Sequence, residues 1–152
     1  MTQFHLRPFS ELSTKQLFDI LKLRQDVFVL EQQCLYPDID ALDQQALHLF
    51  AYDGALDELI AYARVLAPGN KYPDDVAIGR VVTSQSKRGH GLGRLLMQEA
   101  VSHARAQFPD CCTIKISAQE HLEAFYRSMG FSTSSEPYDD DGIMHIDMRL
   151  DG

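Results

Sequence analysis

The chain has 152 residues, 45% of them hydrophobic and 24% charged, with a formal net charge of −8. This size and balance indicate one soluble globular domain spanning residues 1–152, and the acidic charge argues against nucleic-acid binding, which relies on Lys and Arg. No run approaches the roughly 18 apolar residues of a membrane span, and the start "MTQFHLRPFS" lacks the order of a signal peptide, so we expect a cytoplasmic protein.

The first half of the chain is predicted to hold three strands and one helix. Residues 4–9 alternate like a short strand. A helix is predicted over 13–32, because Ser13 is a favourable N-cap and apolar residues recur after it at helical spacing. A loop with one proline and three aspartates follows over 34–43. Residues 48–66 then indicate two strands joined by an Asp-Gly turn.

The second half is predicted to alternate strands and helices. The expected elements are a strand over 76–84, a helix over 91–108, a strand over 111–117, a helix over 120–131, a short strand near Phe131 and a last strand over 144–150. Pro109 ends the first of these helices and Gly130 caps the second. The mixture of hairpins and crossover helices indicates a mixed α/β sheet covered by helices on both faces.

The segment "SQSKRGHGLGRLL" (84–96) is basic in an acidic chain. No Asp or Glu occurs from Val76 to Gln98, and the segment joins a predicted strand to a predicted helix. Free N–H groups at a helix N-terminus, reached over glycines, bind anions, so the segment predicts an anion site. It lacks the Lys-Ser/Thr of a P-loop and the glycine spacing of a dinucleotide fingerprint. A flexible turn without a ligand is the alternative.

The pattern R-x-x-G-x-G, carried by Arg88, Gly91 and Gly93, resembles the pyrophosphate loop of the GCN5-related N-acetyltransferases (the GNAT superfamily). The resemblance implies a centrally splayed sheet, the acyl-CoA N-acyltransferase fold, in which the backbone at 81–83 pairs with the pantetheine of acetyl-CoA. A plain buried strand at 81–83 fits the sequence equally well. The implied coenzyme contacts are Val81, Val82, Thr83, Arg88, Gly89, His90, Gly91, Leu92, Gly93, Arg94 and Gln119. Gln119 is a departure, because the family often has Asn at that position.

Four stretches resemble the ElaA-like branch of this superfamily: "LRQDVFVLEQQCLYPDID", "IGRVVTS", "AQEHLEAFY" and "YDDDGIMHIDM". The resemblance implies an N-acetyltransferase that transfers an acetyl group from acetyl-CoA to a primary amine of a small molecule or peptide, and it leaves the acceptor unidentified. A non-catalytic acyl-CoA-binding or regulatory module on the same fold is one alternative, and a nucleotide-phosphate binder is another. Base rates make a homodimer plausible.

Tyr126, on the second predicted helix, is the catalytic residue that the resemblance implies. It would act as general acid toward the departing CoA thiolate. Because a phenol has a pKa of about 10 and a thiol about 8.5, full proton transfer is uphill, whereas a hydrogen bond that strengthens in the transition state is reasonable. The alternative is a core aromatic residue, since Tyr126 shares a helical face with Leu122 and Met129.

The acceptor side is less specified by the sequence. His48, His145 and Glu31 are the candidates for a general base, and Arg24 lies on an apolar helix face, where its charge needs either a buried carboxylate or a substrate carboxylate. With Tyr36, the candidate acceptor contacts are Arg24, Glu31, Tyr36, His48 and His145. Acids in "YPDIDALD" and "EPYDDDG" favour a cationic amine if they border the acceptor, and are otherwise solvated loops.

The three cysteines do not indicate a disulfide framework. Cys111 and Cys112 are neighbours, Cys34 is remote, and none of them has the spacing of a zinc site. We expect all three to be reduced packing residues and predict no metal site.

Overall fold

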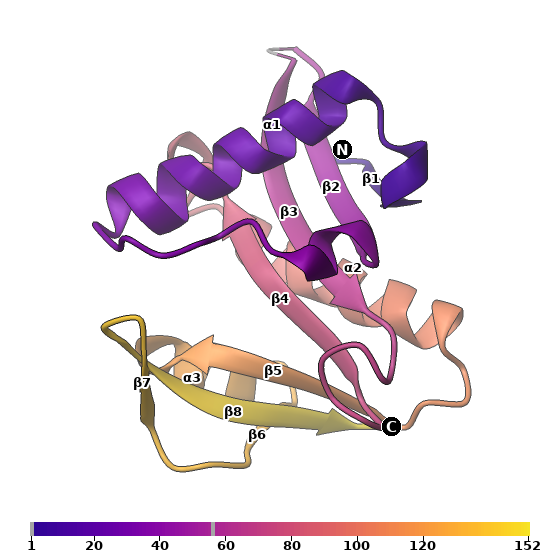
Figure 1. Ribbon diagram of the computed structural model, residues 1–152, viewed down its shortest axis with the longest axis vertical. Coiled ribbons are helices and arrows are strands. Elements are labelled where there is room, and N and C mark those ends of the chain that lie inside the picture. The colour runs from indigo at the N-terminus through magenta and orange to yellow at the C-terminus, as the bar shows by residue number, and fades with distance from the viewer. Residues whose placement is uncertain (1, 56) are drawn as a thin grey trace.

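The computed structural model describes residues 2–55 and 57–152, and it shows an open eight-stranded sheet with helices on both faces (Figure 1). Across the sheet the strands are β1 (Phe4–Pro8), β2 (Leu47–Asp53), β3 (Glu58–Leu66), β4 (Val76–Thr83), β5 (Thr113–Gln119), β8 (Ile143–Asp151) and β6 (Ser132–Thr133), and β7 (Tyr138–Asp140) also pairs with β8. Neighbouring strands are antiparallel except β4 and β5, which are parallel. The predicted mixed α/β class is confirmed.

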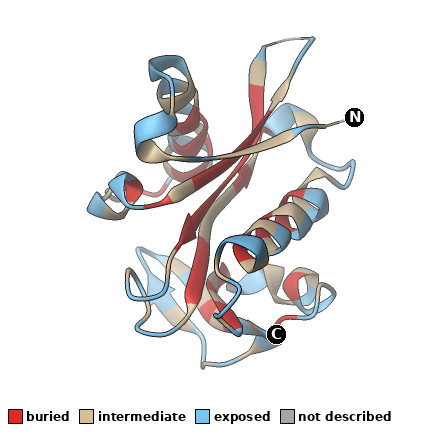
Figure 2. Cartoon of the chain, turned by 90° about the vertical axis from the view of Figure 1, so that its right-hand side faces the viewer, coloured by how far each residue is buried: buried red, intermediate tan, exposed pale blue. Residues whose placement is uncertain are grey.

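The helices lie in two layers. Helix α1 (Thr14–Arg24) and the π-helical segment that continues it (Gln25–Glu31) cover one face, and α2 (Leu92–Gln107) and α3 (Glu123–Arg127) lie on the other (Figures 1 and 2). The predicted cap is present, since the Ser13 side chain accepts a hydrogen bond from the Gln16 N–H at 3.0 Å. Within the described part of the chain, no helix is long and apolar enough to span a bilayer.

Alternation along the central strands builds the core on both sides of the sheet. Leu49 of β2 is fully buried in the layer that contains Leu96 of α2, whereas its neighbour Phe50 is buried in the layer that contains Ile20 of α1. This is the period of a strand buried on both faces. The central strands are accordingly the most buried part of the cartoon (Figure 2).

Strands β4 and β5 part soon after they begin. Among the described residues two registered pairs join them, Val76 with Ile114 and Ala77 with Lys115. Beyond Ala77 the two strands diverge (Figure 1), and β4 also loses regular register with β3 near Arg80, whose φ of 50° is rare for a side-chain-bearing residue. The sheet therefore has the central splay that the resemblance implied.

Three local features differ from the prediction. The first predicted helix ends in π-helical rather than α-helical turns. The helix predicted over 120–131 begins as a 3-10 turn and its α-helical part stops at Arg127; Gly130, at φ 100°, then turns the chain so that the Phe131 N–H bonds the Tyr126 carbonyl. Strand β7 lies in the stretch predicted to be an acidic loop, and the predicted short strand near Phe131 is confirmed as β6.

Candidate active site

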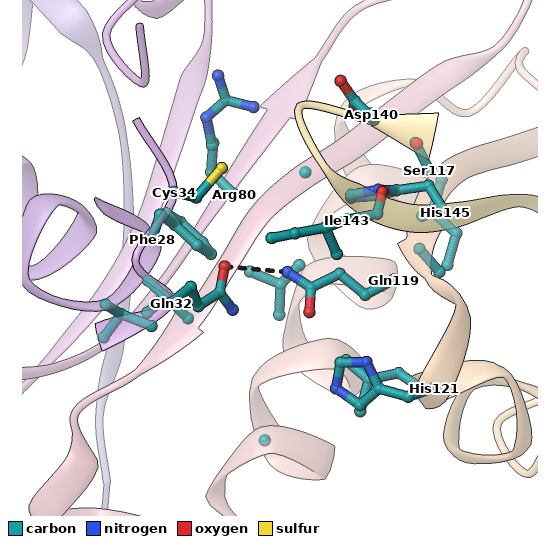
Figure 3. Close-up of a pocket in the computed structure, with 18 of the residues that line it drawn as sticks. Phe28, Gln32, Cys34, Arg80, Ser117, Gln119, His121, Asp140, Ile143 and His145 are labelled. Atoms are coloured by element: carbon teal, nitrogen blue, oxygen red, sulfur yellow. Dashed lines mark hydrogen bonds between the residues drawn. The ribbon is translucent and has the colours of Figure 1, made fainter. Parts of the chain in front are cut away.

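A cavity of about 500 Å³ occupies the opening between the diverging strands. Its walls come from the middle of β4, the end of β5, the start of β8, α3 and the segment that follows α1 (Figure 3). The sequence-predicted residues that line it are Glu31, Tyr36, Val81, Val82, Thr83, Arg88, Gly93, Gln119, Tyr126 and His145. Residues from distant parts of the chain thus meet at the splay.

The other predicted site residues lie elsewhere. His90, Gly91 and Leu92 line a separate hollow beside the glycine loop. Arg94 is exposed, donates a hydrogen bond to the Ser128 hydroxyl at 2.7 Å and lies over the ring of a neighbouring phenylalanine. Gly89 lines neither hollow. Coenzyme contact by these residues stays a prediction.

The glycine loop leads directly into α2, as predicted. Gly91 is the N-cap of this helix and has a φ of 81°, and Gly89 has a φ of 86°. A methyl group at Gly91 would meet no atom within 4 Å, so the left-handed backbone rather than crowding favours glycine there. The loop is open toward solvent, and the first turn of the 16-residue helix presents N–H groups that have no acceptor within the helix. These are the properties of an anion-binding loop.

Tyr126 is a buried titratable residue on the cavity wall. Its side chain is 6% exposed, and burial raises its pKa to about 12, so the phenol is protonated at neutral pH. The rings of Phe125 and Phe131 contact it edge to face, with centroids 5.1 and 5.9 Å away. Among the described residues its hydroxyl has no hydrogen-bond partner, so its hydrogen is available to a group in the cavity.

His145 lines the same cavity. Its Nδ1 lies 2.8 Å from the Ile143 carbonyl oxygen, and its ring stacks on Tyr138. Because a carbonyl only accepts, Nδ1 carries the hydrogen in the neutral ring, and Nε2 is then the basic nitrogen. Sequence analysis missed a second histidine at the cavity, His121, which is exposed near α3 (Figure 3).

Arg24 is fully buried in a network of ion pairs. Its Nε lies 2.9 Å from Asp38 Oδ2 and its Nη1 lies 2.7 Å from Asp43 Oδ1. Burial alone would raise the pKa of Asp43, but the hydrogen bonds from Arg24 and the charge of its guanidinium hold that pKa at about 2. Arg24 does not line the cavity, so the candidate assignment as an acceptor contact is corrected: its partners are buried carboxylates, the other alternative.

His48 belongs to the same network. Its Nε2 lies 2.9 Å from the Asp43 carbonyl oxygen and its Nδ1 lies 2.6 Å from the Tyr62 hydroxyl. Burial lowers the pKa of His48, and both ring nitrogens are engaged. The assignment of His48 as a general base or acceptor contact is therefore corrected, because it lies outside the cavity with no free nitrogen.

The acids of the loop after α1 are neutralised by arginines from two strands. Arg64 of β3 lies 2.7 Å from Asp40 and 2.9 Å from Asp43, and Arg80 of β4 lies 2.8 Å from Asp38. The carboxylates of Asp38 and Asp43 are buried and Asp40 is partly exposed, and all three are paired with arginines, so this loop does not offer free carboxylates to an acceptor. Arg80 also lines the cavity; the sequence showed it only as one more basic residue in the acid-free window.

The acids of the β7–β8 turn face the cavity. Asp140 and Asp141 line its mouth, and both are exposed. Cys34 Sγ donates to the Asp141 carbonyl at 3.1 Å, which ties this turn to the segment after α1. No ion pair to either carboxylate is present among the described residues. The location of these two acids is therefore consistent with the prediction that acids beside the acceptor favour a cationic amine.

Glu31 and Gln32, at the end of the π-helical segment, contact both sides of the splay. Glu31 forms a two-pronged ion pair with Arg88, with distances of 2.6 and 2.9 Å. Gln119 Nε2 donates to Gln32 Oε1 at 3.2 Å across the cavity (Figure 3). Neither pairing was foreseen, because each joins residues far apart in the sequence. Within the described ranges, no group of three or more His, Cys, Asp or Glu residues could hold a metal ion.

The comparisons with known proteins agree on one family. The family model described as an acetyltransferase (GNAT) domain matches residues 12–151. Protein ElaA from Escherichia coli is 43% identical over 142 residues, which cover 91% of this chain and 90% of that protein. A crystal structure of an acyl-CoA N-acyltransferase from Pseudomonas aeruginosa aligns with a TM-score of 0.92 at 39% identity, covering 99% of both chains. The crystal structure of E. coli ElaA aligns with a TM-score of 0.91 at 38% identity over 99% of this chain and 100% of that one.

Proposed function

Because the chain belongs to the GNAT acetyltransferase family, in its ElaA-like branch, we propose that it transfers an acetyl group from acetyl-CoA to a primary amine of a small molecule or peptide in the cytoplasm. The observation that carries this proposal is the cavity in the splay, whose wall holds Arg88 and Gly93, from the two ends of the glycine loop, together with Tyr126 and His145. Donor binding, proton acceptance and proton donation each have a group on its wall.

The donor half would use main-chain groups. Beyond Ala77 the β5 side of β4 has no registered partner strand among the described residues, so its N–H and C=O groups can pair with the amides of a pantetheine arm along 81–83. The glycine loop, the N-terminus of α2 and Arg88 would hold the diphosphate. The roles of Gly89 to Arg94 and of Gln119 belong to this proposal.

The chemical step needs a neutral amine and a stabilised leaving group. His145 Nε2 would take a proton from the acceptor ammonium, directly or through water, and the neutral amine would then attack the acetyl carbonyl. The nitrogen loses a second proton to solvent as the carbon–sulfur bond breaks and the amide forms. Tyr126 would donate a hydrogen bond to the departing thiolate. With a pKa of about 12, Tyr126 stays protonated, so the thiolate's proton comes finally from solvent.

The first experiment separates donor binding from turnover. CoA at about 100 times its Kd should stabilise the protein by about 2.7 kcal/mol in thermal unfolding, and acetyl-CoA with a panel of polyamines, aminoglycosides, amino acids and peptides should release free thiol with at least one amine. If CoA leaves the unfolding temperature unchanged, the proposal is wrong. Stabilisation without thiol release from any amine would support the non-catalytic acyl-CoA-binding module instead.

The acids at the cavity mouth predict a cationic acceptor. For the amine found by the panel, Asp140→Asn with Asp141→Asn should raise KM about two- to tenfold and change kcat little, because exposed carboxylates each contribute weakly to binding a cation. The matched control is Asp74→Asn with Asp75→Asn, a second adjacent pair that does not line the cavity. Steady-state kinetics gives both constants. An unchanged KM, or turnover confined to anionic acceptors, would refute this part.

A further inference from the structure

Glu31 and Gln32 hold two polar side chains at the splay that are predicted to contact the coenzyme, Arg88 and Gln119. Arg88 lies in the loop after β4, and Gln119 ends β5, so the two come from opposite arms of the opening. Glu31 holds the first and Gln32 holds the second. We refer to Glu31 and Gln32 together as the clasp; Figure 3 shows its glutamine reaching across to Gln119.

The pairing of Arg88 is incompatible with full use of the same side chain by a diphosphate. Both of its terminal nitrogens face the Glu31 carboxylate, and Nη2 also donates to the Thr83 carbonyl at 3.3 Å. A diphosphate would need this same fork of donors. The Glu31 carboxylate therefore competes with a diphosphate for the Arg88 guanidinium.

The ion pair is also exchangeable. The side chains of Arg88 and Glu31 are 38% and 34% exposed, and ion pairs at such exposure are weak because water and salt screen them. A diphosphate carries more charge than one carboxylate and gains the N–H groups of the glycine loop as well. We therefore expect the diphosphate to replace the Glu31 carboxylate as the partner of Arg88 when the coenzyme binds.

We propose that coenzyme binding opens the clasp. The diphosphate takes Arg88 from Glu31, Gln119 turns from Gln32 to the pantetheine, and the freed Glu31 carboxylate joins Asp140 and Asp141 on the wall that meets a cationic amine. Glu31 is thus a positioning residue that changes partner, and the acceptor side is complete only after the donor is bound. This inference rests on the proposed function.

The test is CoA affinity, measured by calorimetry, in Glu31→Gln. Removing the internal competitor should tighten the Kd of CoA about two- to fivefold, as expected for loss of a weak pair. Pantetheine, which lacks the diphosphate, should bind the variant and the natural protein equally. Glu99→Gln makes the same charge change on α2, where Glu99 pairs only weakly with His103 at 3.5 Å, and it should leave the Kd of CoA unchanged.

A double-mutant cycle with Arg88→Ala isolates the pair. In that background Glu31→Gln should no longer affect CoA binding. Persistence of the full effect would mean that Glu31 only repels the diphosphate at a distance, and weaker CoA binding by Glu31→Gln would mean that Glu31 orients Arg88 for the coenzyme; either result overturns the proposal. So does an acceptor KM that Glu31→Gln leaves unchanged. Failure of the natural protein to bind CoA would instead contradict the proposed function.

Discussion

Replacing Tyr126 by phenylalanine is expected to lower kcat about 100-fold or more while the Kd of CoA stays within about twofold, in the range that general acid groups contribute. The phenol lies on the cavity wall with its hydrogen unused by any described residue, so the change removes a donor to the thiolate and leaves packing intact. Steady-state kinetics with the amine found by the panel, together with calorimetry for CoA, checks both expectations.

The same variant should fold as well as the natural protein. Removing a hydroxyl that has no protein partner orphans no buried group, so the unfolding midpoint should hardly change. Tyr72→Phe is the matched control, because Tyr72 is a half-buried tyrosine away from the cavity, and its kcat should be that of the natural protein. An unchanged kcat in Tyr126→Phe would remove this residue from the mechanism.

Replacing Arg24 by methionine is expected to cost about 3–5 kcal/mol of unfolding free energy, the range for breaking a buried ion pair from one side. Arg24 is 0% exposed and serves Asp38 and Asp43 at once. Methionine fills most of the volume, so the loss reports the ion pairs of Arg24, and Arg80 still contacts Asp38 at 2.8 Å. Arg64 still contacts Asp43 at 2.9 Å, which places the expected cost toward the lower end. Urea unfolding measures this loss of free energy, with the dependence of the unfolding free energy on urea concentration expected to stay unchanged.

The control and the pH dependence sharpen this prediction. Arg127→Met removes an arginine whose side chain is 59% exposed and should cost under about 1 kcal/mol. Since the folded-state pKa of Asp43 is held at about 2, against a usual value of 3.8, its contribution to stability is complete above about pH 4 and is lost as the pH falls to 2. Arg24→Met should flatten this acid limb. A cost below 1 kcal/mol at neutral pH would contradict the network's role.

The glycine loop and its place before α2 could be predicted because their signals are local. A β-branched strand, a basic glycine turn and a helix start follow one another within 76–96, and each is a property of neighbouring residues. The succession of strands and helices along the chain follows in the same way from periodicity, and the mixture of hairpins and crossover helices indicates the two helix layers. The glycine loop therefore follows from the residues themselves, whereas the splay and the role of Tyr126 come from the resemblance to the GNAT superfamily.

The acceptor half could not be predicted because its contacts join distant segments. The sequence shows Arg24 on an apolar face, but only the fold shows that its carboxylates belong to the following loop and that Arg80 shares them. His48 looks like a free base until Tyr62 and a carbonyl are placed beside it. The π-helical turns that bring Glu31 to Arg88 follow from packing rather than propensity.

The early parting of β4 from β5 also bears on how this protein can diverge. A ligand that takes the missing strand's place meets N–H and C=O groups that every residue except proline carries. Substitutions along this stretch of β4 can follow the needs of the core without altering what that edge offers. The segments bearing Tyr36 and Asp140 line the cavity with side chains instead, so under the proposed function mutation there would change the acceptor while main-chain binding of the donor is retained.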